Sequence, residues 1–346
     1  MTKSETPRKR DFKKPAAVFI GILISAFFLV MAFRELQPEI FFASLKEVNL
    51  GLLALAAPIY VLAVVIITFR WQLLLRSIKL IPISKLFQLV TIGYMGNNVY
   101  PLRAGEALRI FLMRRNHQIP MAKTTTTIIV ERMFDGLVLI SFILIALLIG
   151  DVESAEINNI VITIGPVFVI GILLLFGLVF RPGLLRKLIH WVARILPDAF
   201  AAPIIRMGDD VVSGLEGLRS PWYLLGAILA SFLTWGIEAL VYWIVMFAFQ
   251  IDLPYSVALI TVGAVNLAGV LPASPGQVGV WEFFVMLVLG AVGITRETAL
   301  AYAIVVHIII WSTVTFLGFF FLMRQGLGWS AIIHTEELEP AGIVST

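Results

Sequence analysis

The stretch that decides the fold runs from residue 97 to residue 109 and reads Asn97-Asn98-Val99-Tyr100-Pro101-Leu102-Arg103-Ala104-Gly105-Glu106-Ala107-Leu108-Arg109. It follows an apolar run, yet it contains two asparagines, a proline, a glycine, a glutamate and two arginines. Polar and ionisable side chains at bilayer depth are costly, so they usually line a cavity or a polar pathway. Proline and glycine interrupt a helix and free backbone groups, which are tolerated only inside protein or beside water. This stretch is therefore the first candidate for a functional site.

The composition of the whole chain is that of an integral membrane protein. Of the 346 residues, 60% are hydrophobic and 14% are charged, and the mean hydropathy is +0.96. Soluble domains contain roughly 25% charged residues. Apolar runs of about 18 residues suit α-helices that cross a hydrocarbon core about 30 Å thick, whereas barrel strands would be shorter and would alternate. The sequence contains no cysteine, which excludes disulfides, iron–sulfur clusters and cysteine nucleophiles.

The charges beside the apolar runs indicate a topology. Residues 1–15 form a basic tail, and the run that follows is too long for a signal peptide, so we expect an uncleaved anchor with a cytoplasmic N-terminus. The net charge of +4 reflects such topology signals and does not indicate nucleic-acid binding. Six runs are long enough to cross the membrane, namely residues 16–33, 50–69, 128–149, 160–180, 222–249 and 299–323.

Two further apolar segments are too short to span the membrane. Residues 86–100 would cover about 22 Å as a helix, and both flanks are basic, so we expect a re-entrant hairpin. It breaks at Pro101 and Gly105 and returns through residues 104–115. Residues 255–271 lead into a second hairpin. Its break contains four helix-breaking residues, Pro272, Pro275, Gly276 and Gly279.

The predicted fold class is an all-α polytopic membrane protein with six full transmembrane helices and two re-entrant or broken hairpins. A single membrane domain covers residues 16–323, with a cytoplasmic amphipathic connection at 181–219 and a polar tail at 324–346. A count of eight spans, in which the hairpin arms cross the bilayer, stays open. The hairpins share an order of glycine, asparagine, proline and glutamate and lie in opposite halves of the chain, which points to an inverted repeat. Chance recurrence of these residues is the alternative.

Charged residues in the return arm of the first hairpin point to phosphate chemistry. In a helix, Glu106 lies within one turn of both Arg103 and Arg109. Guanidinium groups bind phosphate oxygens with two parallel hydrogen bonds. We therefore name as candidate substrate-binding residues Arg103, Arg109, Arg132 and Asn98. The alternative is an interfacial helix with ordinary salt bridges.

A second charged cluster opens the span at residues 128–149. Glu131 and Asp135 share a helix face, where like charges repel unless a cation compensates them, and Arg132 lies on an adjacent face. We expect a buried ion network in which Arg103 or Arg109 supplies the cation. The alternative is that these acids only favour the N-terminus of a helix.

Three more ionisable residues lie in the second half of the chain. Glu238 lies in mid-span and must face protein or water, either as a proton-coupling group, as the partner of a basic head group, or as a protonated structural residue. Glu282 lies beside the second break and is placed in the same ion network. We expect His307 to be a hydrogen-bonded packing residue. The sequence contains no metal-ligand pattern, glycine-rich phosphate loop or nucleophile elbow, so no cofactor, metal or catalytic residue is predicted.

Three motifs occur in order along the chain: Asn98-x-x-Pro101-x-Arg103-x-Gly105-Glu106-x-x-Arg109, Glu131-Arg132-x-x-Asp135, and Pro272-x-x-Pro275-Gly276-x-x-Gly279-x-x-Glu282. Together they resemble the flippase-like transmembrane domain of lysylphosphatidylglycerol synthases and its stand-alone, largely uncharacterised membrane relatives. The similarity covers nearly all of residues 16–323. The family commonly has Pro-Gly-Gly-x-Gly at the second break, whereas this chain has Gln277 as its third residue.

The resemblance implies movement of a lipid across the membrane. In the bifunctional synthases this domain is taken to move an aminoacylated lipid that a separate synthetase domain makes. The sequence does not show that synthetase domain, so aminoacyl transfer is not expected. Some archaeal relatives resemble this domain joined to a glycosyltransferase of lipid-linked sugars. The substrate class is therefore a phospholipid or a polyprenyl-phosphate-linked lipid.

We predict a flippase-like transporter in the cell (plasma) membrane that moves an anionic or phosphate-bearing lipid. The arginines would receive the head group, and Glu106, Glu131 and Asp135 would hold those arginines and allow release. Membrane lipids are the expected partners, with a lipid-modifying enzyme as a second partner. Two alternatives stay open: a membrane-embedded transferase that uses a lipid phosphate donor, and a non-catalytic scaffold for a partner enzyme.

Overall fold

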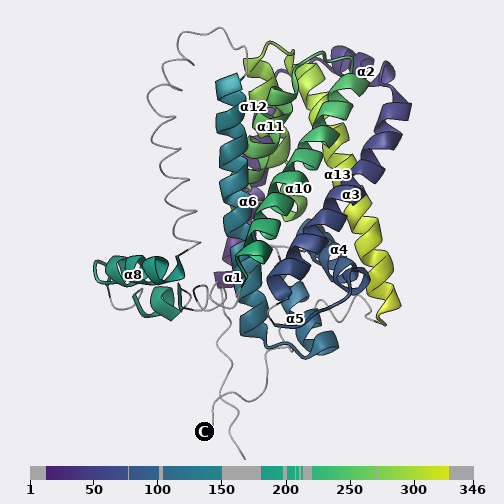
Figure 1. Cartoon of the computed structure of the whole chain (residues 1–346). Coiled ribbons are helices and arrows are strands. Elements are labelled where there is room, and N and C mark those ends of the chain that lie inside the picture. Colours follow the sequence, from purple (N-terminus) through teal and green to yellow (C-terminus); the bar gives the residue numbers. More distant parts are fainter. Residues whose placement is uncertain are drawn as a thin grey trace, which may run out of the picture.

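A computed structural model of the chain shows a helical bundle (Figure 1). The described residues are 13–76, 78–100, 104–149, 181–197, 201–206, 208–209, 212, 220–269 and 271–326. All regular secondary structure within these ranges is helical. This confirms the predicted fold class, an all-α polytopic membrane protein.

Five of the six predicted spans coincide with long apolar helices. These are α1 (Lys13–Phe33), α3 (Leu50–Leu75), α6 (Met121–Ile149), α10 (Pro221–Ala248) and α13 (Arg296–Arg324). The last four can each cross a membrane by length and composition, and α1 qualifies together with α2 (Pro38–Lys46), from which it is bent by 87°. The sixth predicted span, residues 160–180, lies outside the described residues.

Two of these helices are longer than predicted, which changes the place of their charged residues. Helix α3 continues past residue 69, so Arg70 lies inside it. Helix α6 begins before residue 128 because Thr125 and Thr126 donate their hydroxyl groups to carbonyl oxygens one turn earlier, at 2.9 and 3.0 Å. These bonds satisfy the hydroxyl groups of a polar segment within its own helix. Glu131 consequently lies almost three turns inside α6 rather than in its first turns.

Both predicted hairpins are present as pairs of short helices that pack against each other. The first consists of α4 (Ile83–Val99) and α5 (Gly105–His117), and the second of α11 (Tyr255–Ala268), the 3-10 turn η2 (Pro275–Gln277) and α12 (Val280–Ala291). Helices α4 and α5 lie toward the lower end of the bundle in Figure 1, and α11 and α12 lie toward the upper end. This placement fits hairpins that enter from opposite faces of the membrane.

The two halves of the chain make equivalent helix contacts. Helices α3, α4, α5 and α6 correspond in order to α10, α11, α12 and α13. Helix α4 packs against α13, and α11 packs against α6; α3 packs against α13 as α10 packs against α6. Helices α3 and α10 pack against each other. Reciprocal pairing of this kind follows from a two-fold relation between halves, so it supports the predicted inverted repeat.

Glycines allow the arms of the first hairpin to approach closely. A Cβ added at Gly96 would lie 2.6 Å from Cα of Gly105. The amide N–H of Gly105 donates to Oδ1 of Asn97 at 3.0 Å, which fixes the start of α5 against the end of α4. Side chains at the two glycines would separate the helices, because small residues are what permits close helix contact in membranes.

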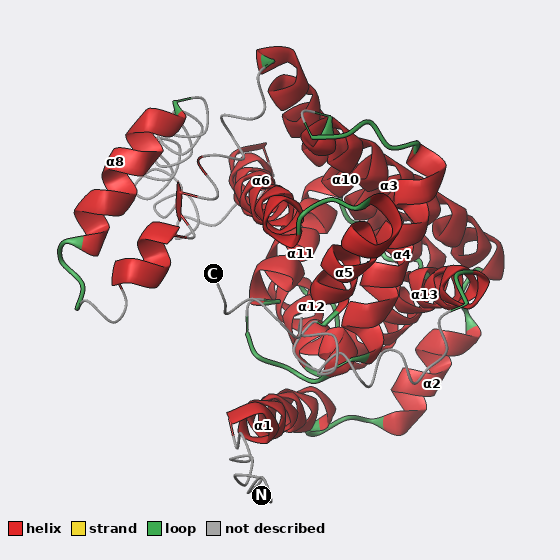
Figure 2. Cartoon of the chain, turned by 90° about the horizontal axis from the view of Figure 1, so that it is seen from below, coloured by secondary structure: helices red, strands yellow, loops and turns green. Residues whose placement is uncertain are grey.

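Helix α1 packs beside the second break, which lies between α11 and α12. Figure 2 shows α1 at the edge of the bundle near α12, against which it packs. The N–H of Ser274 donates to Oγ of Ser25 at 2.8 Å. Gly279 has φ of 91°, a conformation that favours glycine, and an added Cβ would lie 2.5 Å from the carbonyl oxygen of Ser25. The break is therefore held in shape by contacts that only a glycine permits.

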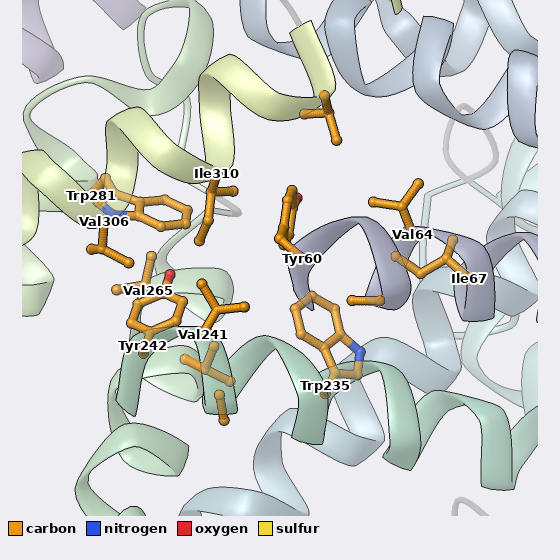
Figure 3. Packing of buried hydrophobic residues seen from close by; sticks show 14 of the residues in the cluster. Tyr60, Val64, Ile67, Trp235, Val241, Tyr242, Val265, Trp281, Val306 and Ile310 are labelled. Atoms are coloured by element: carbon orange, nitrogen blue, oxygen red, sulfur yellow. The ribbon is translucent and has the colours of Figure 1, made fainter. Parts of the chain in front are cut away.

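The apolar core lies where α3 and α10 cross. Figure 3 shows Tyr60 and Val64 of α3 near Trp235 of α10, with Tyr242 farther along the same helix. These side chains are buried, and aromatic residues contribute large buried areas to such a core. Tyr60 and Trp235 also line a cavity of about 620 Å³, so the core supports one wall of the candidate site.

The predicted amphipathic connection at residues 181–219 is described in part and contains α8 (Pro182–Ala193). Its apolar residues Leu184, Leu188 and Trp191 are exposed, whereas Leu185 packs against the main bundle. Figure 1 shows α8 beside the lower end of the bundle. Exposed apolar side chains beside basic ones suit a helix that lies in the membrane interface. Its cytoplasmic location stays a prediction.

Candidate functional site

Helices α3, α5 and α6 bring two arginines to one buried glutamate. Glu131 of α6 has no exposed surface, with a relative exposure of 0%. Nη2 of Arg70 donates to its Oε1 at 2.8 Å, and Nη2 of Arg109 donates to its Oε2 at 3.1 Å. Both arginines are buried as well. The expected buried ion network therefore exists, and Arg109 is one of its cations.

Asp135 lies one turn after Glu131 and extends the network. It accepts hydrogen bonds through Oδ1 from Nη1 of Arg70 at 2.5 Å and from Nε1 of Trp235 at 2.9 Å. Helices α3 and α10 thus both hold this carboxylate. Because the two acids lie deep in α6 and each has an arginine partner, the alternative of acids that merely favour a helix N-terminus does not apply to them.

Together with Glu106, Arg132 is a partly exposed member of the network. Its side chain is 38% exposed, and its guanidinium lies 3.4 Å from Oδ2 of Asp135 and 3.6 Å from Oε1 of Glu106. Glu106 of α5 therefore pairs across to α6. Three arginines and three carboxylates make up the network, so its formal charges balance: Arg70, Arg109 and Arg132 with Glu106, Glu131 and Asp135.

Sequence reasoning missed Arg70. With the span ending at residue 69, Arg70 counted only as a basic residue of the cytoplasmic flank. The signal that was available is the apolar continuation Leu73-Leu74-Leu75, which extends the helix for another turn beyond the arginine. An arginine followed by more apolar helix is placed inside the protein, where it needs a partner.

Arg109 is buried against Trp71, outside the set of residues that line the cavity described below. Its guanidinium carbon lies 4.0 Å from the ring centroid of Trp71, a cation–π contact. A side chain at Gly93 would collide with the aliphatic part of Arg109, so this glycine makes room for it. Arg109 is not among the residues that line the cavity. Its place fits a residue that fixes Glu131 better than one that binds substrate.

A cavity of about 620 Å³ lies between the two hairpins. The first hairpin contributes Asn97, Asn98 and Glu106 to its wall, and the second contributes residues 271–277. Long helices supply further polar groups, which include Arg132 and Asp135 of α6, Glu238 of α10, and His307 and Trp311 of α13. The two breaks predicted from the sequence therefore border one shared cavity.

The tips of the two hairpins meet at Asn98 and Gly276. A Cβ added at Gly276 would lie 3.4 Å from the carbonyl oxygen of Asn98 and 2.9 Å from Nε1 of Trp311. Nδ2 of Asn98 donates to Oγ1 of Thr315 at 2.9 Å. The side chain of Asn98 thus attaches the first tip to α13, while the residue as a whole also borders the cavity.

Glu282 and His307 form a buried pair in the second half. Oε2 of Glu282 accepts the N–H of Gly279 at 2.6 Å and caps α12, as acids do at helix N-termini. Its Oε1 lies 2.6 Å from Nδ1 of His307, whose ring stacks on Trp281 with centroids 4.6 Å apart. His307 is a hydrogen-bonded packing residue, as expected. Glu282 pairs with it rather than with the arginine network.

Two predicted site residues, Pro101 and Arg103, lie outside the described residues. Their assignment stays a prediction. Gly105, Pro272 and Pro275 lie where the hairpin arms begin or end, as expected for helix breaks.

Comparison with known proteins identifies the family. The family model described as the lysylphosphatidylglycerol synthase TM region matches residues 18–318. The chain belongs to this family. The matched residues include both hairpins and every residue that lines the cavity between them. The resemblance carried by the three sequence motifs is thereby confirmed.

Several archaeal proteins are similar along most of the chain. Glycosyltransferase AglD of Haloferax volcanii is 25% identical over 320 residues, which is 84% of this chain and 51% of AglD. The chain thus spans about half the length of that relative. UPF0104 membrane proteins of Pyrococcus horikoshii and Methanocaldococcus jannaschii are 21% and 22% identical, over 90% and 87% of this chain and 97% and 92% of their own lengths.

Proposed function

We propose that this protein moves an anionic or phosphate-bearing lipid across the membrane, with the head group in the cavity and the acyl or prenyl chains in the bilayer. The observation that carries the proposal is a cavity of about 620 Å³ bordered by both broken hairpins and by a half-exposed arginine. Paired interrupted helices that face one another are the arrangement in which transporters place their substrate. Membership of the family supports the same reading.

Arg132 is the residue that receives the phosphate in this proposal. Its contacts to Asp135 and Glu106, at 3.4 and 3.6 Å, are longer than the roughly 2.7–2.9 Å of a strong charge-assisted hydrogen bond. Phosphate oxygens can therefore replace these carboxylates on Arg132 at a small cost in free energy. When the carboxylates bind Arg132 again, the head group is released. Arg103, which the sequence motif names, is proposed as a second phosphate ligand.

Three buried residues hold the helices around Arg132 in place, namely Arg70, Arg109 and Glu131. All three are buried, and each arginine has a carboxylate within 3.1 Å. A buried charge that loses its partner is strongly destabilising, so these residues hold α3, α5 and α6 together while Arg132 exchanges partners. In this proposal the partly exposed Arg132 binds the head group, and the buried members of the same network hold the helices in place.

The proposal is tested with purified protein in vesicles that contain acyl-labelled phosphatidylglycerol, whose movement is followed by quenching of the outer leaflet. We expect Arg132→Ala to slow the movement about tenfold or more, since a hydrogen bond to a charged group contributes roughly 1.5–3 kcal/mol. Arg76→Ala removes an exposed arginine at the C-terminal end of α3 and should leave the rate unchanged. Wild-type protein that moves no labelled lipid would contradict the proposal, as would an Arg132→Ala variant with the wild-type rate.

The similarity to AglD favours a second candidate, a role in lipid-linked glycosylation. In that case the phosphate in the cavity belongs to a polyprenyl-phosphate carrier, and the protein either moves the carrier or transfers a group from it. Mass spectrometry of membrane lipids from cells with and without the protein separates these outcomes. A new covalent lipid product that depends on the protein would favour the transferase.

A further inference from the structure

Glu238 differs from the other buried acids that border the site. Glu131 and Asp135 pair with arginines, and Glu282 pairs with His307. Among the described residues, no basic side chain lies within 4 Å of the Glu238 carboxylate, and its polar neighbour is Nδ2 of Asn266 at 3.4 Å. Glu238 is 6% exposed and lines the cavity. It is therefore a buried acid with access to the cavity and no counter-charge from the described part of the chain.

The repeat gives Glu238 a counterpart in the first half. Glu238 precedes Asn266 of the second hairpin by the same number of residues by which Arg70 precedes Asn98 of the first. Arg70 lies in α3 and Glu238 in α10, which are equivalent helices that pack against each other. The first half uses this position for a cation that is neutralised by two acids. The second half uses it for an acid that has no cationic partner among the described residues.

We propose that Glu238 is a proton-binding site and that its proton moves together with the anionic head group. An ionised carboxylate without a partner is costly when buried, and the neutral form removes most of that cost. A negative head group in the same cavity repels an ionised Glu238 but not a protonated one. Binding of the head group therefore favours binding of the proton, and the reverse also holds. Loss of either one favours loss of the other. This inference rests on the proposed function and names its driving force.

The surrounding groups do not supply the missing positive charge. The titratable groups that border the same cavity or lie beside Glu238 are Tyr60 of α3, Tyr94 of α4, Tyr100 at the end of α4, Glu106 of α5, Arg132 and Asp135 of α6, Tyr242 of α10, Tyr255 of α11 and His307 of α13. Of the two basic members, Arg132 is paired with Asp135 and Glu106, and His307 with Glu282. A proton is thus the simplest way to neutralise Glu238.

A proton fits this site better than a metal cation does. The described residues contain no group of three or more histidine, aspartate or glutamate side chains placed to hold a metal ion. Nδ2 of Asn266 also donates to the carbonyl oxygen of Val262 at 2.9 Å, which fixes the amide group beside Glu238 as a donor. Calcium takes six or more oxygen ligands and magnesium an octahedron, so one carboxylate is not enough.

The test uses the full-length protein in vesicles with labelled phosphatidylglycerol and a pH difference of about one unit, at zero membrane potential. At one proton per lipid, the label should accumulate about tenfold in the leaflet on the alkaline side, because one pH unit is a factor of ten in proton activity. Glu238→Gln imitates the protonated form and should abolish the accumulation while lipid still moves. Glu297→Gln removes a buried carboxylate of α13 that is outside the cavity and should behave as wild type.

Each outcome decides a different point. Wild-type protein that moves no lipid contradicts the proposed function. Lipid that moves without accumulation contradicts this inference alone, as does a Glu238→Gln variant with the wild-type accumulation. Accumulation that follows a sodium gradient instead of the pH difference would replace the proton by sodium.

A second measurement does not depend on the folding of a variant. Dicyclohexylcarbodiimide reacts with a protonated carboxyl group, whose O–H adds across a C=N bond to give an O-acylisourea. Mass spectrometry of treated wild-type protein should find this adduct on Glu238, with a yield that falls as the pH rises. An unmodified Glu238 beside modified exposed acids would overturn the inference.

Discussion

The arginines of the site have different tasks because they differ in exposure. Arg132 borders the cavity with a side chain that is 38% exposed, whereas Arg109 lies between Trp71 and Glu131. Arg70 is buried between the two acids of α6 and also donates to Oγ of Ser231 at 3.0 Å. In the proposed function, a phosphate group in the cavity contacts Arg132, and the two buried arginines set the position of the carboxylates that compete with it.

The buried arginine Arg70 is expected to be needed for stability. Arg70→Ala leaves Asp135 with the longer contact to Arg132 and leaves Glu131 with Arg109, so the free energy of unfolding should fall by about 3–5 kcal/mol. Unfolding in detergent by a denaturant titration measures the change. Arg76→Ala, at the same helix end but exposed, is the matched control and should cost less than about 1 kcal/mol, since it loses only an exposed cation–π contact with Tyr223. Equal stability of the two variants would show that the network does not hold the helices together.

At the scale of the element, the second break is defined by its backbone. Gly276, Gln277 and Gly279 have φ values of 69°, 60° and 91°. The family pattern has glycine at the position of Gln277, and the structure gives a reason, since positive φ is unstrained for glycine. With Gln277 in place of glycine the turn keeps its shape, but the positive φ of this residue costs about 1–2 kcal/mol.

Opposite effects are expected at Gln277 and Gly279. Gln277→Gly relieves strain but adds backbone entropy to the unfolded state, so stability should stay equal or rise by up to about 1 kcal/mol. Gly279→Ala must keep φ near 91° and place its Cβ 2.5 Å from the carbonyl oxygen of Ser25, so it should displace α1 and destabilise the protein. Thermal unfolding in detergent compares the two. A Gln277→Gly variant that loses more than about 1 kcal/mol would mean that the glutamine side chain makes a contact the turn requires.

At the scale of the whole molecule, the sequence predicted the helices and hairpins better than it predicted which charged side chains pair with one another. The hairpins were predictable because proline and glycine interrupt apolar segments too short to span a bilayer, as at Gly105 and Gly276. The end of α3 and the start of α6 were missed, since a buried arginine and back-bonded threonines do not look apolar. Which arginine pairs with Glu131 depends on how α3, α5 and α6 pack, and a single sequence does not contain that information.

A substitution that fills the cavity tests whether the whole assembly works as a transporter. Gly136 follows Asp135 in α6 and lines the cavity, and no atom lies within 4 Å of a Cβ added there. Gly136→Phe would therefore extend into open space, so it should leave stability nearly unchanged while it slows the movement of labelled phosphatidylglycerol about tenfold or more. Gly290→Phe, at an exposed glycine of α12 with equally open surroundings, should leave the rate unchanged. If both variants transport at the wild-type rate, the head group does not pass through the space between the hairpins, and the contacts of Arg132 would have to serve another purpose.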